Sequence, residues 1–302
     1  MFDRVLVATD LEDGMYRLGL CLKDFHNSGV KALNFVHAIP WGDRQVGGIP
    51  ESHDPEIKAA RDVIQTYIDP EVVQTTFDPA ITVKVGKPGE VLQRAIEEFD
   101  ADVLILGPPG RSLLAEKVFG STTMKLIQQL KIPILIMRPQ LVASMTVAEL
   151  QLRCGHLFDY LLVPCDLESP KQRLLDMLSP LLCQQTKCEA VMLLAAIDTS
   201  SRRYSEERAD ELCRNAEAKL RELGEYFTQQ VGHPLSIEYS VRKGSPVKEI
   251  LTTAQEEDIT AIATSSTNIG KIWELTVPSI TGEILRRSWH SVLFFPPAFG
   301  QS

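Results

Sequence analysis

The sequence predicts two tandem α/β domains, each built on a five-stranded parallel sheet. Strand-like and helix-like segments alternate along the whole chain, which is typical of a parallel sheet covered by helices on both faces. A hydrophobic run followed by an aspartate opens each half, over residues 2–12 and 158–168. The length of 302 residues fits two domains of roughly 150 residues each.

The two openings indicate that a whole domain was duplicated. Residues 2–12 read FDRVLVATDLE and residues 158–168 read FDYLLVPCDLE, with Asp10 and Asp166 at the same place. Similarity that recurs at so long a period is the signature of repeated structural units. We therefore expect a first domain over residues 1–140, a linker over 141–157 and a second domain over 158–302.

In the first half, short apolar runs predict the strands and three-and-four spacing predicts the helices. The expected strands cover residues 4–9, 31–39, 80–85, 102–106 and 132–137. The expected helices cover about residues 15–25, 57–68 and 91–99, with a further one from about residue 121. Gly29 is placed to end the first helix, and Pro88 precedes the third.

The second half repeats this order of elements. Strands are expected over residues 160–164, 190–197, 236–241, 259–263 and 291–295. Ser169 and Pro170 predict a helix start, because an N-cap residue is followed by proline at the first helical position. Residues 205–230 carry apolar side chains at three-and-four spacing, which predicts a long amphipathic helix.

Composition and charge exclude several classes of protein. The net charge of −9 argues against a dedicated nucleic-acid binder, which needs clustered lysine and arginine. The longest apolar run, residues 190–197, is far shorter than the ~18 residues of a membrane span. There is no signal-peptide pattern, so a cytoplasmic protein is expected. Its six cysteines form no C-x-x-C pair and are expected to be reduced thiols.

The sharpest local feature is a glycine loop between a strand and a helix. Gly107 and Gly110 are followed, nine residues later, by Gly120, Ser121 and Thr122. Glycine lets the backbone turn sharply and approach a ligand closely. The start of the following helix offers free N–H groups and a positive dipole end, so the pattern suits a phosphate group. Neither the P-loop nor the G-x-G-x-x-G fingerprint is present.

The spacing G-x2-G-x9-G-S resembles the nucleotide-binding signature of the universal stress protein family. Other matching pieces are V-A-T-D at residues 7–10, V-H-A at 36–38, G-K-P-G-E at 86–90 and I-P-I-L-I-M at 132–137. The resemblance covers essentially the whole chain as two tandem copies. It implies a doubly wound, Rossmann-like fold in each copy, and pairing of the two last strands within one chain. A homodimer of the whole chain stays open.

The resemblance also implies a site for ATP or AMP in the first domain, with Mg²⁺ as a candidate companion ion. Asp10 would contact the adenine, and a carboxylate accepts hydrogen bonds from an amino group. The remaining residues would line the base pocket (Ala8, Thr9, Ala38), lie near the ribose (Leu106, Gly107) and hold the phosphates (Gly110, Gly120, Ser121, Thr122). Arg111 is either a phosphate contact or a solvated charge. Asp10 could instead cap the next turn, and His37 is expected to be structural.

Two departures bear on this site. Pro108 and Pro109 remove two N–H donors from the loop, which either weakens phosphate binding or stiffens the loop into a preformed shape. In the second half, aligning Pro133 with Ser291 sets residues without the glycine pattern opposite the loop: Ser265, Asn268, Pro278 and Ser279. We therefore expect no nucleotide site of the family kind in the second domain.

The expected function is a cytosolic stress-response protein that binds ATP or AMP and acts as a regulatory module. No Ser-His-Asp set, carboxylate pair or metal cluster stands out, so hydrolysis of ATP would be slow. One alternative is a nucleotide-independent scaffold whose second domain docks a protein or an apolar molecule. Another is an enzyme acting on an activated nucleotide, which the lack of a catalytic constellation disfavours.

Overall fold

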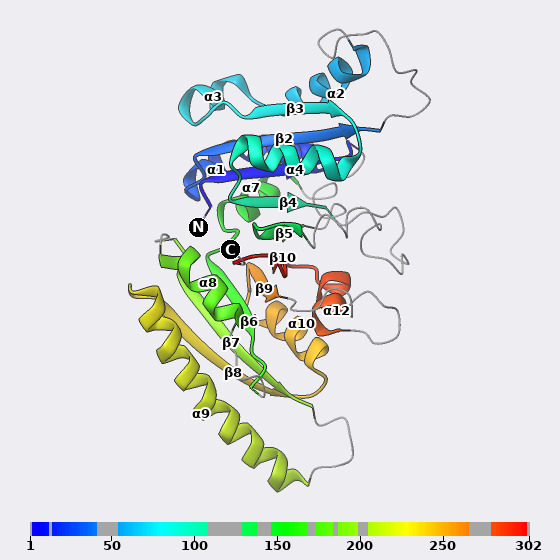
Figure 1. Cartoon of the computed structure of the whole chain (residues 1–302). Helices are drawn as coiled ribbons and strands as arrows, with labels where there is room; N and C mark the ends of the chain where they lie inside the picture. The colour runs from blue at the N-terminus through cyan, green and yellow to red at the C-terminus, as the bar shows by residue number, and fades with distance from the viewer. Residues whose placement is uncertain are drawn as a thin grey trace. The chain divides into compact units, whose positions relative to one another are not determined.

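The protein is described here by a computed structural model. It describes residues 2–11, 14–40, 54–107, 129–137, 146–167, 173–183, 187–198, 205–265 and 279–300. The chain separates into two compact units, an N-terminal unit (Phe2–Gly155) and a C-terminal unit (His156–Gly300) (Figure 1). Each unit is an α/β structure with a parallel sheet, as the sequence predicts.

The sheet of the N-terminal unit reverses direction at its first strand. The strand order is β3-β2-β1-β4-β5, and the neighbouring strands run parallel. The chain builds outward from β1 through β2 to β3, then returns to add β4 on the other side of β1. The ends of β1 and β4 therefore form a topological switch point, where open α/β sheets bind their ligands. The strands are β1 (Arg4–Ala8), β2 (Ala32–Ile39), β3 (Ala80–Val85), β4 (Val103–Leu106) and β5 (Ile134–Ile136).

Local capping explains where helices of this unit begin. Asp54 and Asp69 each accept a hydrogen bond from the backbone N–H two residues ahead, and proline follows each of them. Aspartate at the N-cap with proline at the first helical position is a favoured start. The helices of the described part are η1 (Met15–Cys21, a 3-10 helix), α1 (Leu22–Asn27), α2 (Pro55–Gln65), α3 (Pro70–Thr75), α4 (Pro88–Phe99) and α7 (Val147–Gly155).

Two helix predictions are corrected in this unit. The helix expected over residues 15–25 is a 3-10 helix followed by a short α-helix, with Gly14 in a left-handed conformation before it. The helix expected over residues 57–68 ends at Gln65, because Asp69 starts the separate helix α3. Helix α3 is a single short segment, PEVVQT, with no buried residue, so it is too short to show a helical repeat of apolar residues.

The C-terminal unit has the corresponding strand order, β8-β7-β6-β9-β10, with β6 in the place of β1. Its strands are β6 (Tyr160–Pro164), β7 (Ala190–Ile197), β8 (Ser236–Lys243), β9 (Ala261–Ser265) and β10 (Ser291–Phe295). Its helices in the described residues are α8 (Arg173–Cys183), α9 (Glu206–Val231), α10 (Pro246–Glu256) and α12 (Ile280–Arg287). The start predicted at Ser169 and Pro170 lies outside the described residues.

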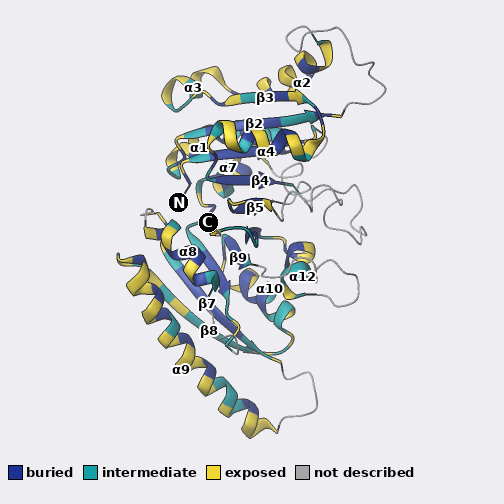
Figure 2. Ribbon diagram, viewed as in Figure 1, coloured by how far each residue is buried: buried dark blue, intermediate teal, exposed yellow. Residues whose placement is uncertain are grey.

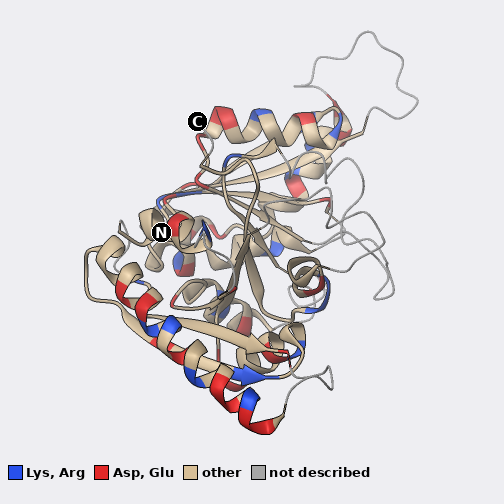
Figure 3. Ribbon diagram, turned by 60° about the horizontal axis from the view of Figure 1, so that its bottom comes forward, with Lys and Arg blue, Asp and Glu red and all other residues tan. Residues whose placement is uncertain are grey.

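Helix α9 shows how the amphipathic pattern places the core. Ser205 caps it by accepting a hydrogen bond from the Arg208 N–H at 3.3 Å. Its apolar stripe packs on β7, β8 and α8, whereas Lys, Arg, Asp and Glu alternate on the rest of its surface (Figure 3). Buried residues concentrate on this stripe and on the central strands (Figure 2). None of the helices in the described part of the chain combines the length and apolarity of a membrane span.

The two sheets repeat the same register. Leu6 pairs with Leu104 in one unit, and Leu162 pairs with Ile262 in the other. Likewise Leu106 pairs with Ile136, and Thr264 pairs with Phe294. The segment from Leu106 to Ile136 therefore has the same length as the segment from Thr264 to Phe294. The alignment that sets Ser265 opposite Gly107 therefore agrees with the sheet register.

Backbone details recur at equivalent places as well. Gly86 donates to the Ile39 carbonyl and Gly244 to the Ile197 carbonyl, both at 2.9 Å. Asp100 and Asp258 both have a positive φ, 52° and 51°, at the end of a helix. Non-glycine residues rarely adopt this conformation, so its recurrence supports duplication of a whole folded unit.

Candidate functional site

The end of β1 carries the first group of predicted site residues. Ala8 and Thr9 are buried, and Asp10 is exposed at the edge of the sheet. The Thr9 N–H donates to the Val36 carbonyl at 3.0 Å, which continues the ladder between β1 and β2 by one residue. The backbone that precedes Asp10 is thus fixed by the sheet.

The residues around Asp10 form a tight turn. The Leu11 N–H donates to the Thr9 hydroxyl at 3.0 Å, and Leu11 has a positive φ of 65°. Its side chain packs against the buried cluster that includes Ile39 and Ile57. A leucine in the left-handed region carries conformational strain that the surrounding packing must hold. The equivalent Leu167 has no positive φ, so the two units differ at this turn.

The ends of the strands on either side of β1 supply the second group. Ala38 near the end of β2 is half-buried, Leu106 at the end of β4 is buried, and half-buried Gly107 follows directly. Because β2, β1 and β4 are parallel neighbours, these residues and Asp10 leave the sheet at the same edge. Five predicted residues, Gly110, Arg111, Gly120, Ser121 and Thr122, lie outside the described residues.

His37 has the structural role that the sequence suggests. Its Nδ1 lies 2.9 Å from the Thr9 carbonyl oxygen, at hydrogen-bonding distance. This contact links β2 to the turn that carries Asp10. The equivalent residue in the C-terminal unit is Ala195, which follows Leu194 on β7, so that the contact has no counterpart there.

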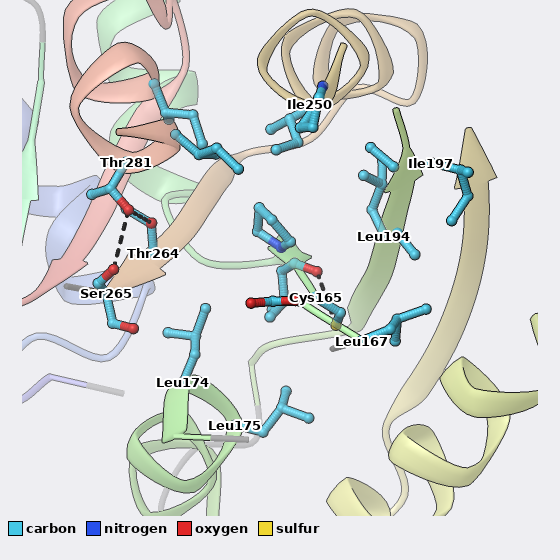
Figure 4. A pocket seen from close by; sticks show the side chains of 18 of the residues that line it. Cys165, Leu167, Leu174, Leu175, Leu194, Ile197, Ile250, Thr264, Ser265 and Thr281 are labelled. Carbon is cyan, nitrogen blue, oxygen red and sulfur yellow. Dashed lines mark hydrogen bonds between the residues drawn. The ribbon is translucent and has the colours of Figure 1, made fainter. Parts of the chain in front are cut away.

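The C-terminal unit has a cavity of about 650 Å³ at its own switch point. The ends of β6, β7 and β9 form one part of its wall, and side chains from α8, α9, α10 and α12 form another. Figure 4 shows leucine and isoleucine side chains from several of these elements facing this space. Sequence reasoning missed the cavity, because residues far apart in the chain line it and no local motif marks it.

Cys165 lies at this cavity, at the end of β6. Its thiol is 3.5 Å from the Val163 carbonyl, to which it donates a weak hydrogen bond. Burial raises the pKa of Cys165 to about 12. The thiol is therefore protonated at neutral pH. All six cysteines are free.

We expect Cys165 to resist alkylation in the folded protein. The thiolate is the nucleophile, and burial suppresses it, so iodoacetamide at pH 8 should modify Cys165 at least about tenfold more slowly than exposed Cys183. Peptide mass spectrometry at timed intervals measures both rates. In urea the two rates should become similar. Equal rates in the folded protein would mean that the Cys165 thiol is accessible and ionised.

Comparison with known proteins gives one family. A model described as the universal stress protein family matches residues 1–138 and 158–296.

Among solved structures, a universal stress protein from Archaeoglobus fulgidus DSM 4304 is 20% identical, with 98% of each chain covered and a TM-score of 0.64. A functionally unknown protein from Pseudomonas aeruginosa PAO1 is 12% identical, covering 98% of this chain and 93% of its own, with a TM-score of 0.55. At these identities the solved structures show a shared fold. No curated protein sequence matches the chain.

Proposed function

Because the chain belongs to the universal stress protein family, we propose that its N-terminal unit binds ATP or AMP and that the protein is a nucleotide-dependent regulatory module of a stress response. The main support is the complete glycine spacing at Gly107, Gly110 and Gly120, directly after β4. That strand borders the switch point of the sheet, where α/β folds bind nucleotides.

Each residue has a defined role in this proposal. Asp10 accepts a hydrogen bond from the adenine amino group, and backbone groups of Ala8, Thr9 and Ala38 line the base pocket. Leu106 and Gly107 lie beside the ribose. Backbone N–H groups and side chains of the loop and of the following helix start hold the phosphates: Gly110, Arg111, Gly120, Ser121 and Thr122. Mg²⁺ would accompany ATP.

The same proposal covers the organisation of the chain. We propose domains over residues 1–140 and 158–302, with 141–157 as a linker that includes α7. Leu150 and Cys154 of α7 are buried, and the helix packs on η1 and α1. Each unit ends its strand order on the last strand, β5 or β10. Pairing of these strands within one chain, and a homodimer of whole chains, are parts of the proposal, as is a cytoplasmic location.

We propose that only the N-terminal unit binds nucleotide. In the C-terminal unit, Pro164 replaces Ala8, Ser265 replaces Gly107 and Ile280 replaces Thr122 in the aligned positions. Proline has no N–H, and a side chain at Ser265 occupies space that a glycine leaves open. One site per chain is therefore the expected stoichiometry.

Substitution of Gly120 tests the phosphate part of the site. Gly120→Pro removes one N–H and adds a ring, so ATP affinity should fall by about tenfold, equivalent to about 1.4 kcal/mol. Isothermal titration of ATP into both proteins measures the change, and circular dichroism checks that the variant is folded. Ser279→Pro, the matched change beside the equivalent loop, should leave ATP affinity unchanged.

Two results would defeat the proposal. Wild-type protein that binds no ATP or AMP at millimolar concentration has no such site. A folded Gly120→Pro variant with wild-type affinity would put the phosphates elsewhere. Mass spectrometry of small molecules that co-purify with the wild-type protein provides an independent check.

A further inference from the structure

We infer that the cavity of the C-terminal unit is a binding site for an uncharged, mainly aliphatic small molecule that carries a hydroxyl group. This inference does not depend on nucleotide binding in the N-terminal unit. It rests on the size of the cavity, its lining, its charges and a pair of threonine hydroxyls.

The cavity has the dimensions and lining of a small-molecule site. Its volume of about 650 Å³ lies within the range of roughly 300–1,000 Å³ typical of ligand pockets. Branched aliphatic side chains dominate its wall, and they come from five different elements: Leu174, Leu194, Ile197, Leu212, Ile250 and Ile284. Burying apolar ligand surface against such a wall is favourable.

Two aligned substitutions relative to the N-terminal unit remove a polar side chain from this place, whereas the change from Leu106 to Thr264 adds a hydroxyl. The aligned pairs replace His37 by Ala195 and Thr122 by Ile280, and both replacements line the cavity. The histidine change removes a ring and leaves space. The threonine change removes a hydroxyl group from the start of the helix, where the first unit is expected to bind phosphate.

The charges at the cavity disfavour an anionic ligand. Among the described residues of the lining, Asp166 and Asp198 contribute two carboxylates and Arg173 contributes one guanidinium. Arg173 donates a hydrogen bond to the Pro297 carbonyl at 3.0 Å. A ligand carboxylate would have to lose its hydration against a mainly aliphatic wall that also carries two carboxylates, so the favoured ligand is uncharged.

A pair of threonines supplies the polar contact. The Thr281 hydroxyl lies 3.1 Å from the Ser265 carbonyl, to which it donates, and 3.0 Å from the Thr264 hydroxyl (Figure 4). Because a hydroxyl has one proton, Thr264 is then the donor to Thr281. Both oxygens keep lone pairs, and both residues line the cavity. They can accept a hydrogen bond from a ligand hydroxyl, whereas a carboxylate has no proton to donate.

Fluorescence titration of the full chain with the uncharged probe N-phenyl-1-naphthylamine tests the inference. We expect binding of one probe per chain, displacement by 1-decanol, and displacement by decanoate that is at least about tenfold weaker because its charge must be desolvated. ATP should not displace the probe.

Two matched variants locate the probe. Ile280 and Val147 are both exposed aliphatic residues at the first position of a helix, at 47% and 44% relative exposure, but only Ile280 lines the cavity. Ile280→Asp should weaken probe and decanol binding at least about tenfold, because a carboxylate enters the apolar wall. Val147→Asp should leave both affinities unchanged.

Any of four results would overturn the inference. These are no binding of probe or decanol by wild type, wild-type affinity in Ile280→Asp, equal weakening in Val147→Asp, and displacement of the probe by ATP. Decanoate that competes as well as decanol would overturn the uncharged ligand class. ATP titration of the same samples shows separately whether the nucleotide site is intact.

Discussion

Asp10→Ala should weaken ATP and AMP binding by about 10–100-fold, whereas Asp166→Ala should leave both affinities unchanged. The two aspartates occupy the same place after equivalent strands, β1 and β6, and both are exposed. A hydrogen bond to a charged group contributes about 1.5–3 kcal/mol, which sets the size of the effect. In the proposed function only Asp10 has an adenine to contact. Isothermal titration of both variants measures the difference.

A second substitution separates adenine contact from a capping role. Asp10→Asn keeps the shape but adds a donor group, so the amide can pair with the O6 carbonyl of inosine. The ratio of IMP to AMP affinity should therefore rise in Asp10→Asn. If Asp10 only stabilises its turn, the ratio stays constant while the melting temperature falls. Equal losses of affinity in Asp10→Ala and Asp166→Ala would also refute the assignment of the nucleotide to the N-terminal unit.

Phe227→Ala should lower the free energy of unfolding of the C-terminal unit by about 3–5 kcal/mol. Phe227 is completely buried on the apolar stripe of α9, and this helix packs on β7, β8 and α8. Removing the ring takes away its burial and leaves a void that the neighbouring sheet can fill only partly. Amide hydrogen exchange of α9 and β7 measures the loss directly, because a chain of two units need not unfold in one step.

Glu225→Ala is the matched control for this prediction. Glu225 lies two residues before Phe227 on the exposed side of α9. Alanine also has a high helix propensity, so hydrogen exchange should change by no more than about 0.5 kcal/mol. Similar changes in the two variants would mean that α9 contributes little to the core through Phe227.

Apolar runs in the sequence predict most of the described strands. Where the predicted and observed strand bounds differ, the cause is simple. Buried parallel strands are hydrophobic throughout, which is why β7 and β10 have the expected bounds. Strand β9 covers Ala261–Ser265 instead of residues 259–263. Ile259 lies between α10 and β9, directly after Asp258, whose φ is positive. Its side chain is buried although it is not part of the strand. An apolar run indicates buried residues, and some buried residues lie outside the part of the chain that pairs in the sheet. The run therefore does not give the exact bounds of the strand.

The candidate nucleotide site and the cavity differ in how far they could be predicted. The sequence suggests the candidate nucleotide site because its glycines and Asp10 keep the spacing of the family's signature. The cavity depends on side chains such as Leu174, Leu212, Ile250 and Ile284, each of which resembles an ordinary core residue in its own helix. Only their convergence at the ends of β6, β7 and β9 distinguishes them.

By itself the sequence determined the duplication and the α/β fold of each unit, and it suggests the place of one candidate nucleotide site. Repeated strand segments, helical periodicity and glycine spacing are patterns of residues close together in the chain, so they can be recognised in the sequence. The tertiary structure decided that the strands of each unit pair in an equivalent register, that Leu11 takes a strained turn after β1, and that the C-terminal unit has a mainly aliphatic cavity open to solvent. These properties depend on contacts between residues distant in the chain, which a linear sequence does not display.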